Sequence, residues 1–138
     1  MSQQPTEVRA TRLADDLRIS LRARQHELIA DAAVNDGGTD LGPTPHELLA
    51  AALAACTSMT VQMYANRKKW PLKSADVTVL ESKIAAVGEG EAKTVFNVTV
   101  SLDGPMSSEQ RDRLLEIAYR CPVHRALAGA IELNVSLV

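Results

Sequence analysis

Alternating apolar and polar residues predict strands in several parts of the chain. Over residues 17–23 every second residue is apolar, with Arg or Ser between, and the same alternation recurs over 96–102 and 131–137. A period of two places the apolar side chains on one face of a half-buried strand. Residues 7–13 and 26–31 are weaker candidates that would complete a meander with the first strand. The chain is expected to end in a strand at 131–137.

A long antiparallel hairpin is predicted in the second half of the chain. Apolar positions over 77–84 are followed by a Gly- and Glu-rich turn at 88–91 and then by the alternating stretch 96–102. Two apolar runs joined by a short turn of this composition are typical of paired neighbouring strands.

A long helix is predicted from Thr44 to about Lys69. Thr44 can cap the helix, Pro45 suits its first turn, and Glu47 can bond back to the capping amide. Trp70 and the proline after it end the helix. Its first half is apolar all round, which is typical of a helix buried on every side. A chain this short offers little cover for such a helix, so a second subunit is the expected source.

Two shorter helices follow. Ser107 and Gln110 form a second capping-box pattern, and Cys121-Pro122 begins a helix that ends near Gly129. The Gly-, Asp- and Pro-rich stretch 35–43 is expected to be a loop. The sum of strands and helices predicts one α+β domain over residues 1–138.

Composition narrows the functional classes. The 138 residues include 15 basic and 17 acidic side chains, so no basic surface for nucleic acid is indicated. We expect neither a leader segment nor an apolar run of about 20 residues, hence a soluble cytoplasmic protein with no membrane partner. In that reducing compartment the two cysteines are more often reactive or simply buried than permanently bridged.

Cys56 and Cys121 are the candidate redox residues, and their local settings differ. Cys121 precedes Pro122 at a helix start, where free backbone N–H groups favour a thiolate. Cys56 lies within the long helix, so its ionisation needs a cation from elsewhere, most plausibly an Arg. A packing role remains open for Cys56, as does a capping role for Glu47. A zinc site with His46 and His124 is a weaker alternative, because paired ligand spacing is missing.

The residues over 42–59, GPTPHELLAAALAACTSM, resemble a known family of thiol peroxidases when taken with Cys121-Pro122-Val123 and the terminal strand. This is the OsmC/Ohr family, named for osmotically inducible protein C and organic hydroperoxide resistance protein. The stretch 63–68 is similar to an OsmC-like branch whose substrates are less settled. The resemblance covers nearly the whole chain. It implies antiparallel sheets around a long central Cys-bearing helix, in an intertwined homodimer with active sites at the interface.

The resemblance also implies a mechanism. Cys56 matches the peroxidatic cysteine, which attacks the peroxide and becomes a sulfenic acid. Cys121 matches the resolving cysteine, which forms a disulfide with it. A dithiol, often a lipoyl group in this family, would reduce the disulfide. The substrate would be an organic hydroperoxide or hydrogen peroxide, and no bound cofactor or metal is expected.

Two departures from the family pattern concern the residues that activate the peroxidatic sulfur. The family's Glu directly follows the motif's Pro, whereas this chain has His46 there and Glu47 one place later. No residue of this chain matches the family's activating Arg securely. Arg18, Arg22 and Arg24 are candidates, and we select Arg24. We therefore expect catalytic residues Cys56, Cys121, Glu47 and Arg24. The alternatives are a thiol redox sensor or small-ligand-binding dimer without efficient turnover, and a silent dimeric scaffold.

Overall fold

The computed structural model describes residues 4–138, and the chain forms two compact units, Met1–Leu49 and Ala50–Val138. Helix α1 (Pro45–Lys68) begins in the first unit and continues into the second. The helix begins where the sequence predicts, and it ends within one residue of the predicted end. The two units are described in turn.

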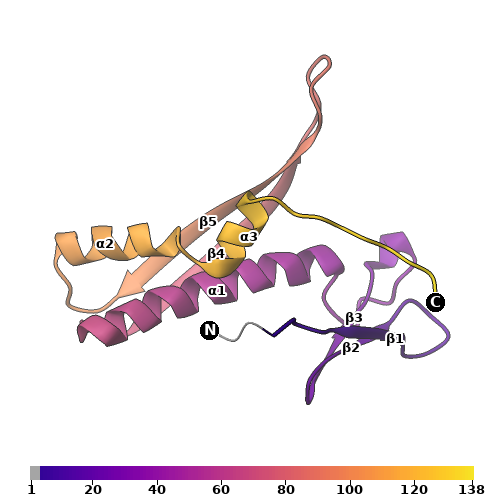
Figure 1. Cartoon of the computed structure of the whole chain (residues 1–138), viewed down its shortest axis with the longest axis horizontal. Coiled ribbons are helices and arrows are strands. Elements are labelled where there is room, and N and C mark those ends of the chain that lie inside the picture. The colour runs from indigo at the N-terminus through magenta and orange to yellow at the C-terminus, as the bar shows by residue number, and fades with distance from the viewer. Residues whose placement is uncertain (1–3) are drawn as a thin grey trace. The chain divides into compact units, whose positions relative to one another are not determined.

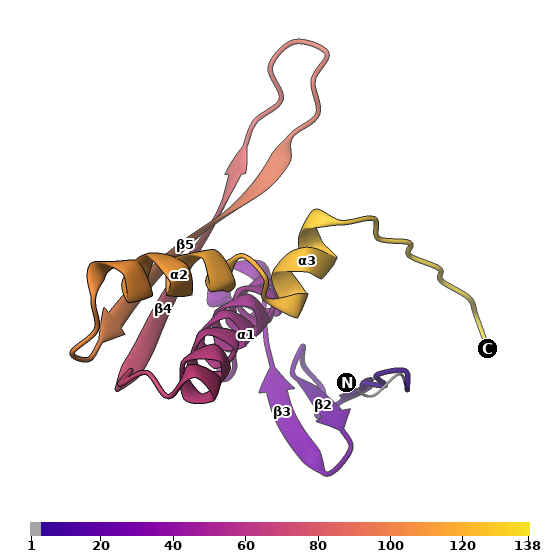
Figure 2. The same ribbon diagram turned by 60° about the vertical axis from the view of Figure 1, so that its left-hand side comes forward.

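The first unit contains a three-stranded antiparallel meander. Strands β1 (Arg9–Arg12), β2 (Ile19–Ala23) and β3 (His26–Ala30) pair in the order β1-β2-β3. Figure 2 shows β2 and β3 joined by a tight turn. Arg24 occupies this turn with φ 55°, a left-handed conformation that few non-glycine residues adopt. The meander predicted from the alternating residues is therefore present, with shorter strands than expected.

A buried carboxylate organises the loop that follows β3. Asp31 is 3% exposed and accepts hydrogen bonds from the Thr39 hydroxyl at 2.7 Å and the Leu41 N–H at 3.0 Å. The Thr39 hydroxyl, then the Leu41 N–H, lower the pKa of Asp31 to about 2. The loop contains a short 3₁₀ turn, η1 (Val34–Asp36), and leads into the start of α1.

The expected capping box is present at the start of α1. The Glu47 N–H donates to the Thr44 hydroxyl at 3.2 Å, and the Thr44 N–H donates to the Glu47 carboxylate at 2.9 Å. These reciprocal bonds satisfy two amides that the helix leaves free. The prediction for this helix start is confirmed.

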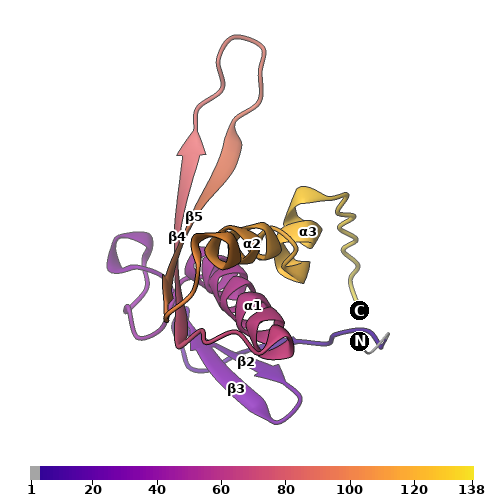
Figure 3. The same ribbon diagram turned by 90° about the vertical axis from the view of Figure 1, so that its left-hand side faces the viewer.

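The second unit packs helices against one side of a long hairpin. Strands β4 (Ser74–Ile84) and β5 (Lys93–Asp103) pair antiparallel along their whole length. Helices α2 (Ser108–Ala118) and α3 (Pro122–Ala128) follow. In Figures 1 and 3, α1 and α2 lie side by side, and the far end of the hairpin extends beyond them.

The core of this unit lies where α1, α2 and the hairpin meet. Its buried residues are small or aliphatic: Val61, Ala65, Leu72, Ala75, Leu114 and Ala118. Tyr64 and Trp70, two of the chain's few aromatic residues, pack against this core. The second capping box is present as well, because Ser107 and Gln110 exchange both expected hydrogen bonds.

Within the single chain helix α1 is buried on one face only, which agrees with the expectation that a chain this short offers little cover for it. Its buried residues, Leu53, Thr57, Val61 and Ala65, repeat every four positions and form one stripe. Met59 and Met63 on another face are each 64% exposed. The remaining elements of a chain this short cover one face of the helix only.

The expected final strand is also missing, because residues 130–138 pair with no strand among the described residues. The segment leaves α3 as an extended stretch, visible in Figure 2. Its apolar residues are exposed, from Ile131 at 58% to Val135 at 99% and Leu137 at 100%. A strand requires the backbone of a neighbour, and the alternating pattern alone does not supply one.

Helix α1 is long enough and apolar enough to cross a membrane, by length and composition only. The expectation that no segment has the length and apolar composition of a membrane span is therefore wrong. Core helices of soluble proteins meet the same criterion of length and composition.

We predict that the contact between α1 and α2 carries much of the second unit's stability. Leu114 is fully buried, whereas its neighbour Leu115 is 51% exposed. Leu114→Ala should lower the free energy of unfolding by about 2–5 kcal/mol, because it leaves a cavity in close-packed surroundings. Leu115→Ala is the matched control and should cost less than about 1 kcal/mol. Urea unfolding of both variants measures the difference, and equal losses would contradict this description of the core.

Candidate active site

The fold brings the two cysteines together, although they are far apart in the sequence. Cys56 lies on α1, and Cys121 is the residue immediately before α3. The antiparallel packing of α1 and α2 carries the chain back along α1, so that the two thiols interact directly. Both cysteines are free thiols.

Cys121 is the more acidic thiol of the pair. Its side chain is fully buried and accepts a hydrogen bond from the His124 N–H at 3.4 Å. Burial raises the pKa of Cys121, but the hydrogen bond from the Cys56 thiol and the His124 N–H outweigh it. The pKa therefore lies below its ordinary value. The expectation that a helix start favours ionisation of Cys121 agrees with this geometry.

Cys56 has the opposite tendency. Its side chain is half-buried, and burial raises the pKa of Cys56, followed by the interaction with Cys121. The Val123 N–H and the Thr60 hydroxyl oppose the rise without overcoming it. None of these main influences on Cys56 is a cation.

Thr57 is a site residue that the sequence analysis overlooked. It is 2% exposed, donates to the Leu53 carbonyl at 2.8 Å, and also contacts the Cys121 sulfur. A hydroxyl has one proton, so donation to Leu53 competes with donation to Cys121. Negative charge on Cys121 favours the second arrangement. The available signal was a polar residue directly after Cys56 in an otherwise apolar run.

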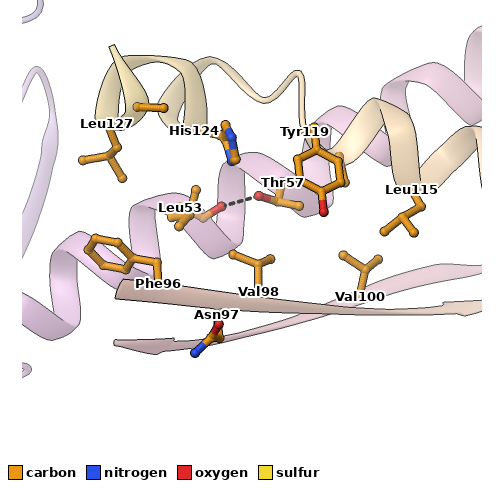
Figure 4. Close-up of a pocket in the computed structure, with 12 residues that line it drawn as sticks. Leu53, Thr57, Phe96, Asn97, Val98, Val100, Leu115, Tyr119, His124 and Leu127 are labelled. Atoms are coloured by element: carbon orange, nitrogen blue, oxygen red, sulfur yellow. Dashed lines mark hydrogen bonds between the residues drawn. The ribbon is translucent and has the colours of Figure 1, made fainter. Parts of the chain in front are cut away.

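A cavity of about 410 Å³ lies beside Thr57 and His124, which both line it. In Figure 4, Phe96, Val98 and Val100 rise from β5, while Tyr119 and His124 face them from the other side. The rest of the lining comes from Leu53, Thr57, Asn97, Leu115, Ala118, Leu127 and Ala128. The lining is mainly aliphatic and aromatic, so it suits an organic group with few polar atoms.

His124 has two contacts at this site. Besides its backbone bond to Cys121, its ring meets the edge of Tyr119, with the ring centroids 5.7 Å apart and the planes at 77°. It is therefore a half-buried residue of the cavity lining. Across residues 4–138 no three potential ligands are grouped as a metal site.

The other expected site residues lie in the first unit. Glu47 is exposed, and its carboxylate accepts the capping hydrogen bonds, which lower its pKa. Arg24 is exposed in the β2–β3 turn, with its guanidinium 3.5 Å from the Gln25 side-chain oxygen. Arg18 and Arg22 form ion pairs with neighbouring carboxylates. The roles of Glu47 and Arg24 at Cys56 stay predictions.

Solved structures share this fold. The structure of an OsmC-like protein from Mycoplasma pneumoniae is 23% identical, with 99% of each chain covered and a TM-score of 0.77. An organic hydroperoxide resistance protein OsmC from Legionella pneumophila is 21% identical, covering 94% of this chain and 93% of its own, at a TM-score of 0.69. The organic hydroperoxide resistance protein OhrB of Bacillus subtilis is 19% identical, with 93% of each covered and a TM-score of 0.65.

A search of curated proteins found no match. The family model described as OsmC-like protein matches residues 37–136, which is well over half of the chain and includes both cysteines. The structures confirm the α+β fold expected from the resemblance, with antiparallel sheets and a long Cys-bearing helix. The chain therefore belongs to the OsmC-like protein family.

Proposed function

We propose that the protein is a thiol peroxidase that reduces organic hydroperoxides, or hydrogen peroxide, by means of Cys56 and Cys121. The supporting observation is the direct interaction of two free thiols, one half-buried and one fully buried. The more accessible sulfur, that of Cys56, meets the peroxide. Relatives of the same fold are named organic hydroperoxide resistance proteins, which agrees with this choice.

In the first step the Cys56 sulfur attacks the outer oxygen of the peroxide, and the O–O bond breaks. A base in the site takes the Cys56 proton, and Cys121, whose pKa lies below its ordinary value, is the titratable group in direct contact with Cys56. The products are a sulfenic acid on Cys56 and an alkoxide, which leaves as the alcohol after gaining a proton. The peroxide is reduced by two electrons, and the Cys56 sulfur is oxidised by two.

In the second step the Cys121 sulfur attacks the sulfur of the sulfenic acid, a disulfide forms, and water leaves. The interaction already made by the thiols means that a small movement is enough to reach disulfide geometry. A dithiol then reduces the bond by two exchange steps and becomes a disulfide itself. The apolar cavity beside Thr57 and His124 would hold the organic part of the hydroperoxide.

A redox sensor with slow turnover is the second candidate. It is favoured by the raised pKa of Cys56 and by the lack of a cation among the main influences on it. A thiol that is largely protonated at neutral pH reacts slowly with peroxide. Turnover with excess dithiol separates the candidates, since a sensor completes one oxidation without sustained peroxide consumption.

A homodimer forms part of the proposal. The single chain leaves Met59 and Met63 on α1 exposed, together with the alternating apolar residues of 131–137. A second copy can cover the helix face, and its sheet edge can pair with the extended C-terminal segment. The partner would also be the source of Glu47 or Arg24 near Cys56, because Glu47 and Cys56 of one helix are about 13.5 Å apart along its axis.

We expect Cys56→Ser to abolish peroxide consumption. Serine keeps the size of the side chain but has no sulfur that can become a sulfenic acid. Consumption of cumene hydroperoxide and hydrogen peroxide, with dithiothreitol as reductant, measures the effect at several pH values near neutrality. If wild-type protein consumes neither peroxide faster than this variant does, the peroxidase proposal is wrong and the sensor or the scaffold is favoured.

Cys121→Ser should leave the sulfenic acid of Cys56 without an internal partner. The acid should persist and proceed to sulfinic acid as the peroxide concentration rises. Mass spectrometry reads the retained oxygen atoms on the Cys56 peptide, while one equivalent of peroxide should give a Cys56–Cys121 disulfide in the wild type. A variant that cycles normally, without extra oxidation, would disprove the resolving role.

The dimer should be visible by sedimentation at micromolar concentration. A chain shortened after Ala130 loses the unpaired extended segment and should shift toward monomer at the same concentration, because it no longer offers a strand to the second copy. Circular dichroism checks that the shortened chain is folded. A stable, folded wild-type monomer would contradict the proposed assembly.

A further inference from the structure

A group of cations surrounds one tyrosine on α1, away from the thiols. Three cationic groups lie over the Tyr64 ring, with Arg67, Lys68 and Arg113 at 5.9, 5.7 and 5.4 Å from its centroid. The Arg113 Nε also donates to the Tyr64 hydroxyl at 3.1 Å. The positive charge of Arg120 also acts on this hydroxyl and helps to lower the pKa of Tyr64. These five residues are called the Tyr64 cation cluster.

The positive charge of this cluster is poorly compensated. Arg113 has an ion pair with Glu116 at 2.7 Å. Over residues 4–138 the exposed side chains of Arg67, Lys68 and Arg120 have no carboxylate within ion-pair distance. Like charges held this close repel one another, and here they gather in a chain whose net charge is −2. An anionic partner would relieve that repulsion.

Stabilisation of the helix dipole explains only part of the cluster. Arg67 and Lys68 lie in the last turn of α1, where cations are favourable. Arg120 follows the end of α2 and is favoured there in the same way, but Arg113 lies in the middle of α2 and has no such reason to contact Tyr64. Trp70 packs edge-on against the ring, with centroids 5.6 Å apart. Tyrosine, tryptophan and arginine together are typical of protein-binding surfaces.

The cluster does not include the thiols, but it comes from the same two parts of the chain as they do. Tyr64 follows Cys56 on α1 at about 12 Å along the axis. Arg120 directly precedes Cys121. A partner seated on the cluster would therefore have the thiol pair within reach of a short flexible arm.

We propose that the Tyr64 cation cluster is the docking surface for an acidic protein that carries the dithiol reductant. This inference rests on the proposed function, because it assigns a partner to the reductive half of the cycle. The docked dithiol attacks one sulfur of the Cys56–Cys121 disulfide, and a mixed disulfide forms. Its second thiol then displaces that sulfur, which leaves two reduced cysteines and an oxidised carrier.

The test compares synthetic dithiol peptides of equal length, one with glutamates around its two cysteines and one with glutamines. The Cys56–Cys121 disulfide is first made with diamide, so the measurement needs no peroxidase activity. At low salt the acidic peptide should reduce the protein about tenfold faster or more, and the advantage should fall as salt rises. Failure of peroxide consumption and failure of docking are thus recorded separately.

The variant Arg67→Gln, Lys68→Gln, Arg120→Gln removes exposed charge and keeps the Arg113–Tyr64 bond. It should lose the preference for the acidic peptide while its reduction by dithiothreitol is unchanged. The matched control changes two exposed hairpin cations, Lys83→Gln and Lys93→Gln, and should keep the preference. Arg120→Gln alone should lose part of it, which provides the test if the triple variant does not fold.

Three results would overturn the proposal. One is equal rates with the two peptides at low salt. Another is full retention of the preference for the acidic peptide by the folded triple variant. If the triple variant does not fold, the same result with the folded Arg120→Gln variant counts instead. The third comes from anisotropy with labelled acidic peptide whose cysteines are replaced by serine. A DNA hairpin and vesicles of anionic lipid are added as competitors at the same charge concentration as unlabelled peptide. If either displaces the labelled peptide as effectively as the unlabelled peptide does, the surface is a general anion site.

Discussion

The buried core shared by α1, α2 and the hairpin is the contact on which the candidate site depends. Small and aliphatic side chains, Ala65 and Val61 on one helix and Leu114 and Ala118 on the other, belong to the same buried cluster. Because the helices run antiparallel, every contact along one fixes the register of the next. The same packing that buries Leu114 therefore delivers Cys121 to Cys56. A larger residue in this stripe would disturb the distance between two sulfurs that it never touches.

Once the sulfurs meet, the donors around them decide where the charge resides. Cys121 has lost solvent but accepts hydrogen bonds from the Cys56 thiol, the His124 N–H and the Thr57 hydroxyl. Burial, followed by the interaction with Cys121, raises the pKa of Cys56. The pair titrates as a unit, and its first ionisation belongs to both residues. The accessible sulfur therefore has the raised pKa and the buried sulfur the lowered one, which is why proton transfer from Cys56 belongs to the proposed first step.

Features set by residues a few positions apart could be predicted from the sequence, whereas a strand that needs a distant partner could not. The two capping boxes, at Thr44 and Ser107, depend on residues three positions apart, so the sequence alone indicates them. The expected strand at 131–137 needed a partner backbone, which no local pattern contains. The proximity of Cys56 and Cys121 was inferred from family resemblance, whereas the lower pKa of Cys121 agrees with its place at a helix start. The position of Thr57 between Leu53 and Cys121 depends on packing in three dimensions.

The buried carboxylate before α1 makes the first unit sensitive to acid. The pKa of Asp31 in the fold is about 2, below its ordinary value of 3.8, so the ionised group favours the folded state at every pH above that value. This contribution fades as the pH falls from about 4 toward 2, where the folded chain too takes up the proton. A neutral acid cannot accept the same bonds from Thr39 and Leu41 as strongly. Below about pH 4 the connection between the meander and the Cys-bearing helix should loosen, while the aliphatic core between α1 and α2, whose buried residues do not titrate there, stays intact.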